Sequence, residues 1–153
     1  MSVKDNISSL NIDISKPPKA VGSYVAYKQV GKLIYISGQL PFKKDGSLIK
    51  GKVGLNIDLK DSQEAAHYCS VNILAQLNQA CSGNLDLVKN CVKITGFVNS
   101  TDTFTDQPIV INPASELIVK VFGENGKHAR AAVSVNSLPL GVAVEIEAIF
   151  ELN

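Results

Sequence analysis

The sequence predicts an α+β domain in which two helices cover one face of a mixed sheet. Two stretches each show one apolar stripe at helical spacing, and five β-rich runs surround them in the order strand, strand, helix, strand, helix, strand, strand. No linker, repeat or low-complexity segment divides residues 1–153, so we expect a single domain. Because each helix has only one apolar stripe, both can share a single sheet face, which gives two layers.

Residues 1–22 are polar and end in a proline-containing stretch, so we expect irregular backbone there, with residues 1–15 frayed. The β-rich runs 24–30 and 33–37 flank Gly31-Lys32, and this pattern is typical of a hairpin with a type II′ turn. Residues 38–60 read as a loop with a tight turn at Asp45-Gly46.

The first long helix is predicted to begin near Asp61, where residues 61–64 have the spacing of a capping box, and to end at Gly83. A strand over 88–98 follows. The apolar stripe of the helix consists of Ala66, Cys69, Ile73, Leu77 and Ala80, and the apolar face of the strand consists of Val88, Val92, Ile94 and Val98.

The second helix is predicted to begin at Asn112-Pro113, with Asn112 as the cap, and to end at Gly123. A short strand over 130–135 and a last strand over 144–152 complete the chain. The stripe of this helix is Ala114, Leu117, Ile118, Val121 and Phe122, and the last strand places Val144, Ile146, Ala148, Phe150 and Leu152 on one face.

Some strands carry apolar residues on both faces, as in residues 33–36. A second apolar sheet face without helices to cover it predicts burial against another subunit, so we expect an oligomer.

Charge and composition exclude several classes of protein. Lys and Arg number 15 and Asp and Glu 14, a balance of +1 that does not fit a protein binding many phosphates, so no nucleic-acid partner is expected. Three cysteines without a C-x-x-C pair, and no apolar signal segment, indicate a cytoplasmic protein with reduced thiols. No apolar span is long enough for a membrane, and neither a metal-ligand spacing nor a phosphate- or dinucleotide-binding motif is present, so we expect no membrane association, metal or cofactor.

Two charged residues remain as candidates for chemistry. Arg130 begins a small, apolar strand, where it could cap the strand or pair with a neighbouring acid, or could bind a carboxylate through two parallel hydrogen bonds. Glu145 could be a solvated acid like Glu147 and Glu151, or an acid–base group. Periodicity and composition leave both readings open.

Four motifs occur together in order: Gly22-Ser23-Tyr24, Ile36-Ser37-Gly38-Gln39-Leu40-Pro41, His128-Ala129-Arg130-Ala131-Ala132-Val133 and Val144-Glu145-Ile146-Glu147-Ala148. In this respect residues 16–152 resemble the YjgF/RidA family of reactive intermediate imine deaminases, and most closely a longer branch with extra length around residues 43–60. The resemblance implies a chorismate-mutase-like fold and a homotrimer whose sheets form an inner barrel, with ligand clefts between subunits.

The resemblance also implies site residues. Arg130 would bind the substrate carboxylate, Glu145 would orient a water, Tyr24 would line the cleft from the adjacent subunit, and Ser37 would lie nearby. Ala132 stands where well-studied deaminases of the family carry a cysteine, and Asn112-Pro113 and His128 also fall at variable positions. The role of His128 is left open, with a loop or surface histidine as the simplest reading.

The activity implied is hydrolytic deamination of 2-imino and enamine acids of the 2-aminoacrylate and 2-iminobutanoate type to 2-oxo acids and ammonia. One alternative is a non-catalytic trimer that senses small carboxylates, which would use Arg130 in the same way. A third reading is the endoribonuclease or translation-inhibitor label attached to the family, which the weak positive charge and the isolated histidines do not favour.

Overall fold

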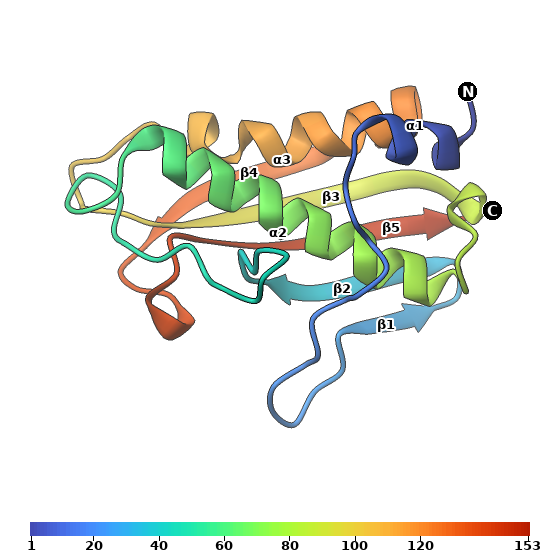
Figure 1. The fold of residues 1–153 in the computed structure, drawn as a ribbon, viewed down its shortest axis with the longest axis horizontal. Helices are drawn as coiled ribbons and strands as arrows, with labels where there is room; N and C mark the ends of the chain where they lie inside the picture. Colours follow the sequence, from blue (N-terminus) through green and yellow to red (C-terminus); the bar gives the residue numbers. More distant parts are fainter.

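A computed structural model describes residues 1–153 and contains the two layers that the sequence predicts (Figure 1). The five strands form one mixed sheet in the order β1-β2-β5-β3-β4, in which only β3 and β4 run parallel. The two long helices, α2 and α3, lie side by side on one face of this sheet (Figure 1). The elements are α1 (Val3–Ser9), β1 (Tyr27–Val30), β2 (Leu33–Gln39), α2 (Leu59–Ala80), β3 (Val88–Asn99), α3 (Gln107–Phe122), β4 (Ala129–Val135) and β5 (Val144–Leu152).

The core lies between the helices and the sheet, and both predicted helical stripes are buried in it. Ala80 alone is only partly buried. β5 alternates as predicted, and Phe150 on its buried face packs against Phe122 of α3 with ring centroids 6.0 Å apart. The fully or nearly fully buried stripe residues are Ala66, Cys69, Ile73, Leu77, Ala114, Leu117, Ile118, Val121 and Phe122.

The predicted hairpin of β1 and β2 is confirmed, and so is the predicted turn at Asp45-Gly46. Val30 pairs with Leu33, which leaves Gly31-Lys32 as the two-residue loop. Gly31 has a φ of 59° and Lys32 does not enter the positive-φ region, as a type II′ turn requires. Asp45 binds the backbone and hydroxyl of Ser47 around Gly46, whose φ is 83°.

The start of α2 differs from the prediction. Asp58, and not Asp61, is the N-cap, and its carboxylate accepts a 2.8 Å hydrogen bond from the Asp61 backbone N–H. Residues 61–64 have the spacing of a capping box, but the helix already begins at Leu59. Asp58 caps it one turn earlier by accepting a hydrogen bond from the backbone N–H of Asp61, the N3 residue.

Removing this cap gives a stability prediction. Asp58→Ala is expected to lower the free energy of unfolding by about 1 kcal/mol, because it leaves a backbone donor of the first turn without its partner. Asp61→Ala is the matched control: it removes only a first-turn negative charge, worth about 0.3–1 kcal/mol. Urea unfolding monitored by circular dichroism compares the two, and equal losses would contradict the assignment of the cap.

α3 also begins earlier than predicted. It starts at Gln107 with Pro108 in its first turn, so Asn112-Pro113 lies inside the helix rather than at its start. Pro113 cannot donate the backbone hydrogen bond to the carbonyl of Ile109, four residues earlier. The side chain of Gln63 in α2 donates to this carbonyl at 3.0 Å, so a neighbouring helix compensates for the proline.

In β3 the predicted alternation holds only in part. The pairing of β3 with β5 shifts register between Val88 and Asn90 and again between Cys91 and Lys93. These irregularities bury Cys91 and leave Val92 39% exposed, so the prediction that Val92 lies on the core face was wrong.

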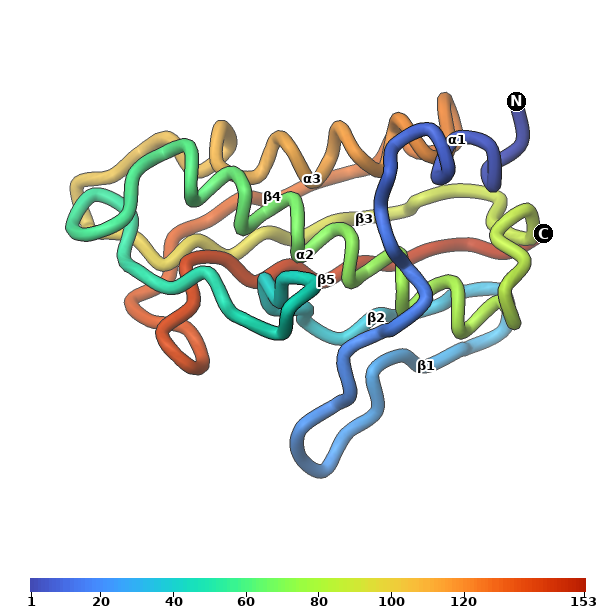
Figure 2. The backbone as a smooth tube through the Cα atoms, in the orientation of Figure 1, coloured from blue at the N-terminus to red at the C-terminus, as the bar shows by residue number.

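The N-terminal segment contains a helix that sequence analysis did not predict. Ser2 and Asp5 form a reciprocal capping box for α1, and Asn6 donates a 2.9 Å hydrogen bond to the Val121 carbonyl of α3. The chain then passes over α2 on its way to β1 (Figure 2), where the Gln76 amide donates to the Pro18 carbonyl at 2.6 Å. No helix in the chain combines the length and the apolar character needed to cross a membrane.

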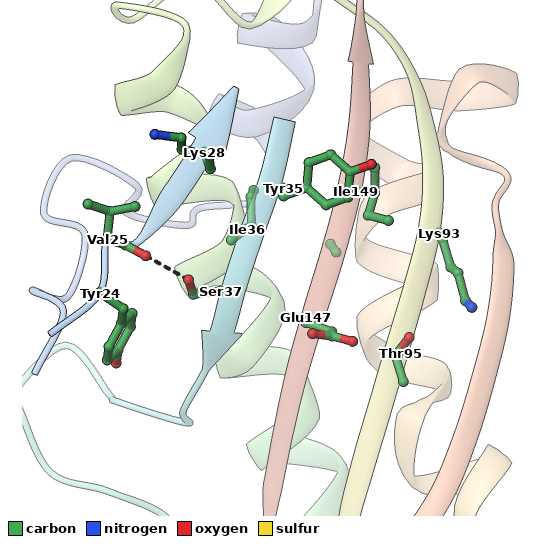
Figure 3. Close-up of a pocket in the computed structure, with 11 residues that line it drawn as sticks. Tyr24, Val25, Lys28, Tyr35, Ile36, Ser37, Lys93, Thr95, Glu147 and Ile149 are labelled. Atoms are coloured by element: carbon green, nitrogen blue, oxygen red, sulfur yellow. Dashed lines mark hydrogen bonds between the residues drawn. The ribbon is translucent and has the colours of Figure 1, made fainter. Parts of the chain in front are cut away.

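The sheet face opposite the helices, here called the open face, is less apolar than predicted. Ile34 and Ile36 point to the helices and are buried, whereas Tyr35 on the open face is 43% exposed. Lys28, Lys93 and Glu147 share this face with apolar neighbours (Figure 3). It is therefore a mixed surface, and it is where part of the candidate site lies.

Candidate functional site

Tyr24 and Ser37 lie together at one end of the open face. They line a shallow cavity of about 600 Å³ together with residues of β1, β2, β3 and β5 (Figure 3). The Ser37 hydroxyl donates a 2.7 Å hydrogen bond to the Val25 carbonyl, which joins the segment carrying Tyr24 to β2. Tyr24 is 54% exposed, so its ring is free to pack against a ligand or another protein chain.

Glu145 projects from β5 on the same open face, between the buried residues Val144 and Ile146. Its carboxyl group lies directly over Gly38, the residue after Ser37: a Cβ added to Gly38 would be 2.9 Å from Cδ of Glu145. The other two acids of the strand differ from it. Glu151 is paired with Lys89 and Asn90, and Glu147 is exposed.

The environment of Glu145 disfavours its charged form. Partial burial raises the pKa of this carboxyl above its ordinary value, and the nearby negative charge of Glu147 adds to the rise. Glu145 forms no ion pair that would oppose this rise. A carboxyl in this state holds a proton to higher pH than a solvated glutamate, which suits a group that exchanges a proton with a bound water.

Arg130 lies on β4, at the edge of the sheet. It is the only arginine of the chain, whose other fourteen basic residues are lysines. Its Nη1 donates to Oδ1 of Asn112 at 2.9 Å and to Oγ of Ser115 at 3.2 Å, both on α3. Arg130 forms no ion pair, so the alternative that it pairs with a neighbouring acid is wrong. Neutral oxygens therefore anchor one side of a guanidinium whose positive charge remains uncompensated.

Arg130 and Glu145 project from opposite faces of the sheet. Arg130 is paired with Ile94, a fully buried core residue, and its hydrogen bonds to α3 place it on the helix side. Glu145 is paired with Phe97. Because Phe97 lies between the buried β3 residues Gly96 and Val98, it points to the opposite face, and Glu145 therefore lies on the open side. A single chain therefore brings Glu145, Tyr24 and Ser37 to one face and directs Arg130 away from them.

Ala132 lies two residues beyond Arg130 on β4 and so shares its face. It is partly buried, packs against the core and pairs with Gly96. The three thiols of the chain lie elsewhere: all three are buried and unpaired, and burial raises the pKa of Cys91 to about 12. No thiol therefore stands beside Arg130.

Sequence reasoning missed three residues around Arg130. Asn112 was predicted as a helix cap, Ser115 was not singled out, and His128 was left as a loop histidine, yet all three belong to the hydrogen-bond network of Arg130. The available signal was the spacing of Asn112 and Ser115, two polar residues three positions apart on one helix face.

No three histidine, cysteine, aspartate or glutamate side chains come together in a way that could hold a metal ion. The candidate residues lie in two places: Arg130, a cation without a counter-ion, on the helix side of β4, and on the open face the Glu145 carboxyl with its raised pKa and the hydroxyls of Tyr24 and Ser37. Fold and site together define a two-layer α+β protein with an unpaired guanidinium at the edge of its sheet.

The chain belongs to the YjgF/RidA family. Residues 6–152 match the family model described as "YjgF/chorismate mutase-like, putative endoribonuclease", which confirms the resemblance. The chain is 42% identical over 152 residues to protein TCP17 of Trypanosoma cruzi, covering 99% of this chain and 94% of the relative. The crystal structure of Atu1372, a protein of unknown function from Agrobacterium tumefaciens, is similar with a TM-score of 0.89 and 40% identity, covering 99% of this chain and 92% of that one. A 2-iminobutanoate/2-iminopropanoate deaminase of Mus musculus is 29% identical over 139 residues, 90% of this chain and 87% of the relative.

Proposed function

We propose that the chain is a hydrolytic deaminase of small 2-imino and enamine acids, which it converts to 2-oxo acids and ammonia. The observation that carries this proposal is Arg130, a single arginine anchored by neutral oxygens and left without a counter-ion. A guanidinium so held is suited to bind a carboxylate through two parallel hydrogen bonds. The mouse relative named as an iminobutanoate deaminase supports the same substrate class.

Two copies of the chain would build each site. Because Arg130 and Glu145 project from opposite sheet faces, a small substrate contacts both only when a second copy brings its open face to the β4 edge. Tyr24, Ser37 and Glu145 then come from one subunit, and Arg130 and the backbone around Ala132 from its neighbour. A homotrimer whose open faces line an inner barrel repeats this contact three times with closed symmetry. The uncovered open face, with Tyr35 43% exposed, supports the assembly.

The proposed reaction begins when Arg130 binds the carboxylate and thereby fixes the adjacent imine carbon. A water oriented by Glu145 adds its oxygen to this carbon, and protons pass from the water to the imine nitrogen. The C–N bond then breaks with its electron pair on nitrogen, ammonia leaves and a C=O bond forms. One water is consumed and one ammonia released, with no change in oxidation state. The raised pKa of Glu145 suits it to accept and return a proton during these steps, and Tyr24 would cover the substrate.

A coupled assay tests this proposal directly. Threonine dehydratase generates the enamine and imine in solution, and their decay is followed by absorbance with and without the protein. Faster decay with stoichiometric release of ammonia supports the deaminase. Tight binding of 2-oxobutanoate without faster decay would instead favour a carboxylate sensor, and RNA cleavage without either result would favour the nuclease reading.

Gly38 offers a further test, because it touches Glu145. Gly38→Ala places a methyl group 2.9 Å from Cδ of Glu145, whose flexible end can move aside at little cost in stability. We expect the variant to melt within a few degrees of the parent, while kcat falls roughly tenfold because the carboxyl is displaced. Differential scanning fluorimetry and the coupled assay measure the two effects, and unchanged kcat would argue against a role for Glu145.

A further inference from the structure

A chain of hydrogen bonds continues from Arg130 into the protein and ends on the backbone. Nη1 of Arg130 lies 3.2 Å from Oγ of Ser115, and this oxygen lies 2.9 Å from Nε2 of His128. Nδ1 of His128 lies 2.7 Å from the carbonyl oxygen of Gly126. This series of contacts is here called the Ser115–His128 relay, and Ser115 is not one of the buried residues with which α3 packs on the core.

The partners determine the direction of every hydrogen bond in the relay. The Gly126 carbonyl can only accept, so Nδ1 of His128 carries the proton. In a neutral ring Nε2 then has a free lone pair, and the Ser115 hydroxyl donates to it. Because a guanidinium only donates, the remaining lone pairs of Ser115 face Arg130. The histidine tautomer thus orients the serine oxygen toward the arginine.

The end of the relay is rigid. Gly126 is buried, and a Cβ at this position would lie 2.5 Å from the backbone oxygen of Ile118 in α3. The glycine whose carbonyl holds His128 is therefore packed tightly against the helix that carries Ser115 and Asn112. α3 and the turn at Gly126 together support Arg130 on the side of its Nη1 atom.

We propose that Ser115 and His128 are positioning residues that hold Arg130 in the orientation in which its free edge binds the substrate carboxylate. Only Nη1 of Arg130 is engaged by the protein, so Nε and Nη2 remain for the ligand. This inference rests on the proposed function and deepens it: it explains how a residue on an edge strand becomes a preorganised receptor. If Arg130 binds ground state and transition state equally through the carboxylate, loss of its support raises KM and Kd and leaves kcat unchanged.

Four variants test the relay. Ser115→Ala removes the hydroxyl, and Ser115→Thr keeps it. His128→Asn can retain the donor to Gly126 but not the acceptor at Nε2, whereas His128→Gln can supply an oxygen near Nε2. We expect Ser115→Ala and His128→Asn to raise KM for 2-iminobutanoate and Kd for 2-oxobutanoate about tenfold, with kcat within about twofold of the parent. Ser115→Thr and His128→Gln should restore most of the affinity.

Calorimetric titration with 2-oxobutanoate and the coupled assay give both readouts, and melting temperatures separate loss of position from loss of fold. Lys127→Gln, an exposed neighbour of His128 paired with Glu124, is the matched control and should behave as the parent. If Arg130→Ala abolishes binding while Ser115→Ala and His128→Asn bind as tightly as the parent, the relay is overturned and the proposed function stands. If Arg130→Ala itself binds as tightly as the parent, the proposed function fails.

Discussion

Replacing Arg130 with alanine is expected to lower kcat/KM for 2-iminobutanoate hydrolysis by at least about a hundredfold. Each hydrogen bond between a charged donor and a carboxylate contributes about 1.5–3 kcal/mol, and about 1.4 kcal/mol corresponds to a factor of ten. Arg130→Ala removes two such bonds together with the only arginine of the chain. Melting should change little, because the side chain is only partly buried and pairs with no acid.

Arg130→Lys refines this prediction. Lysine keeps the positive charge but cannot present two parallel donors, so we expect it to recover only about a tenth of the lost efficiency. Lys120→Ala, which removes an exposed positive charge from α3, is the control for a general effect of charge. Equal activity of Arg130→Ala and the parent in the coupled assay would refute the assignment of Arg130 as the carboxylate receptor.

The second large effect is expected at Glu145, where glutamine should lower kcat about a hundredfold or more and leave KM nearly unchanged. Glutamine preserves the shape of the side chain over Gly38 and removes its ability to take up a proton. In the parent, kcat should fall as the pH drops through the raised pKa of Glu145, because the base becomes protonated. The variant should lose this dependence. A parent-like pH profile in Glu145→Gln would contradict the role of this carboxyl.

Although Glu145→Gln should lower kcat, it should raise the stability of the fold at neutral pH. The pKa of Glu145 is raised in the folded state, so ionisation costs stability, and that cost appears as the pH rises from the ordinary value of 4.5 through the raised one. Glu145→Gln is therefore expected to melt above the parent at neutral pH and to lose this advantage below pH 4.5. Thermal melts at both pH values measure the difference.

Sequence patterns predicted the layers better than the boundaries. The apolar stripes of α2 and α3 and the alternation of β5 can be read within a single element, because each depends only on which side of that element faces the core. The start of α3 was misplaced because Pro113 reads as a helix start, and only the tertiary contact from Gln63 makes it tolerable inside the helix. The burial of Cys91 in place of Val92 depends on the register irregularities between β3 and β5, which no local pattern reveals.

For the candidate site, too, the sequence predicted the residues but not their arrangement. Residue types and motif order were enough to single out Arg130, Glu145, Tyr24 and Ser37, and family membership confirms the resemblance behind that choice. Their distribution over two sheet faces depends on strand pairing, because β4 and β5 bring Arg130 and Glu145 to opposite sides through their registers with β3. The relay behind Arg130 joins residues of α3 to a turn and a strand end, and periodicity alone does not show such contacts.

The most direct measurement is complementation between two inactive variants. Arg130→Ala and Glu145→Gln chains are unfolded together, refolded in equal amounts and assayed on 2-iminobutanoate, with subunit exchange verified by native mass spectrometry. If each site takes Arg130 from one copy and Glu145 from its neighbour, random mixing restores both residues at about a quarter of the sites, and about a quarter of the parent activity returns. Mixed assemblies with no more activity than either variant alone would contradict a site shared between subunits.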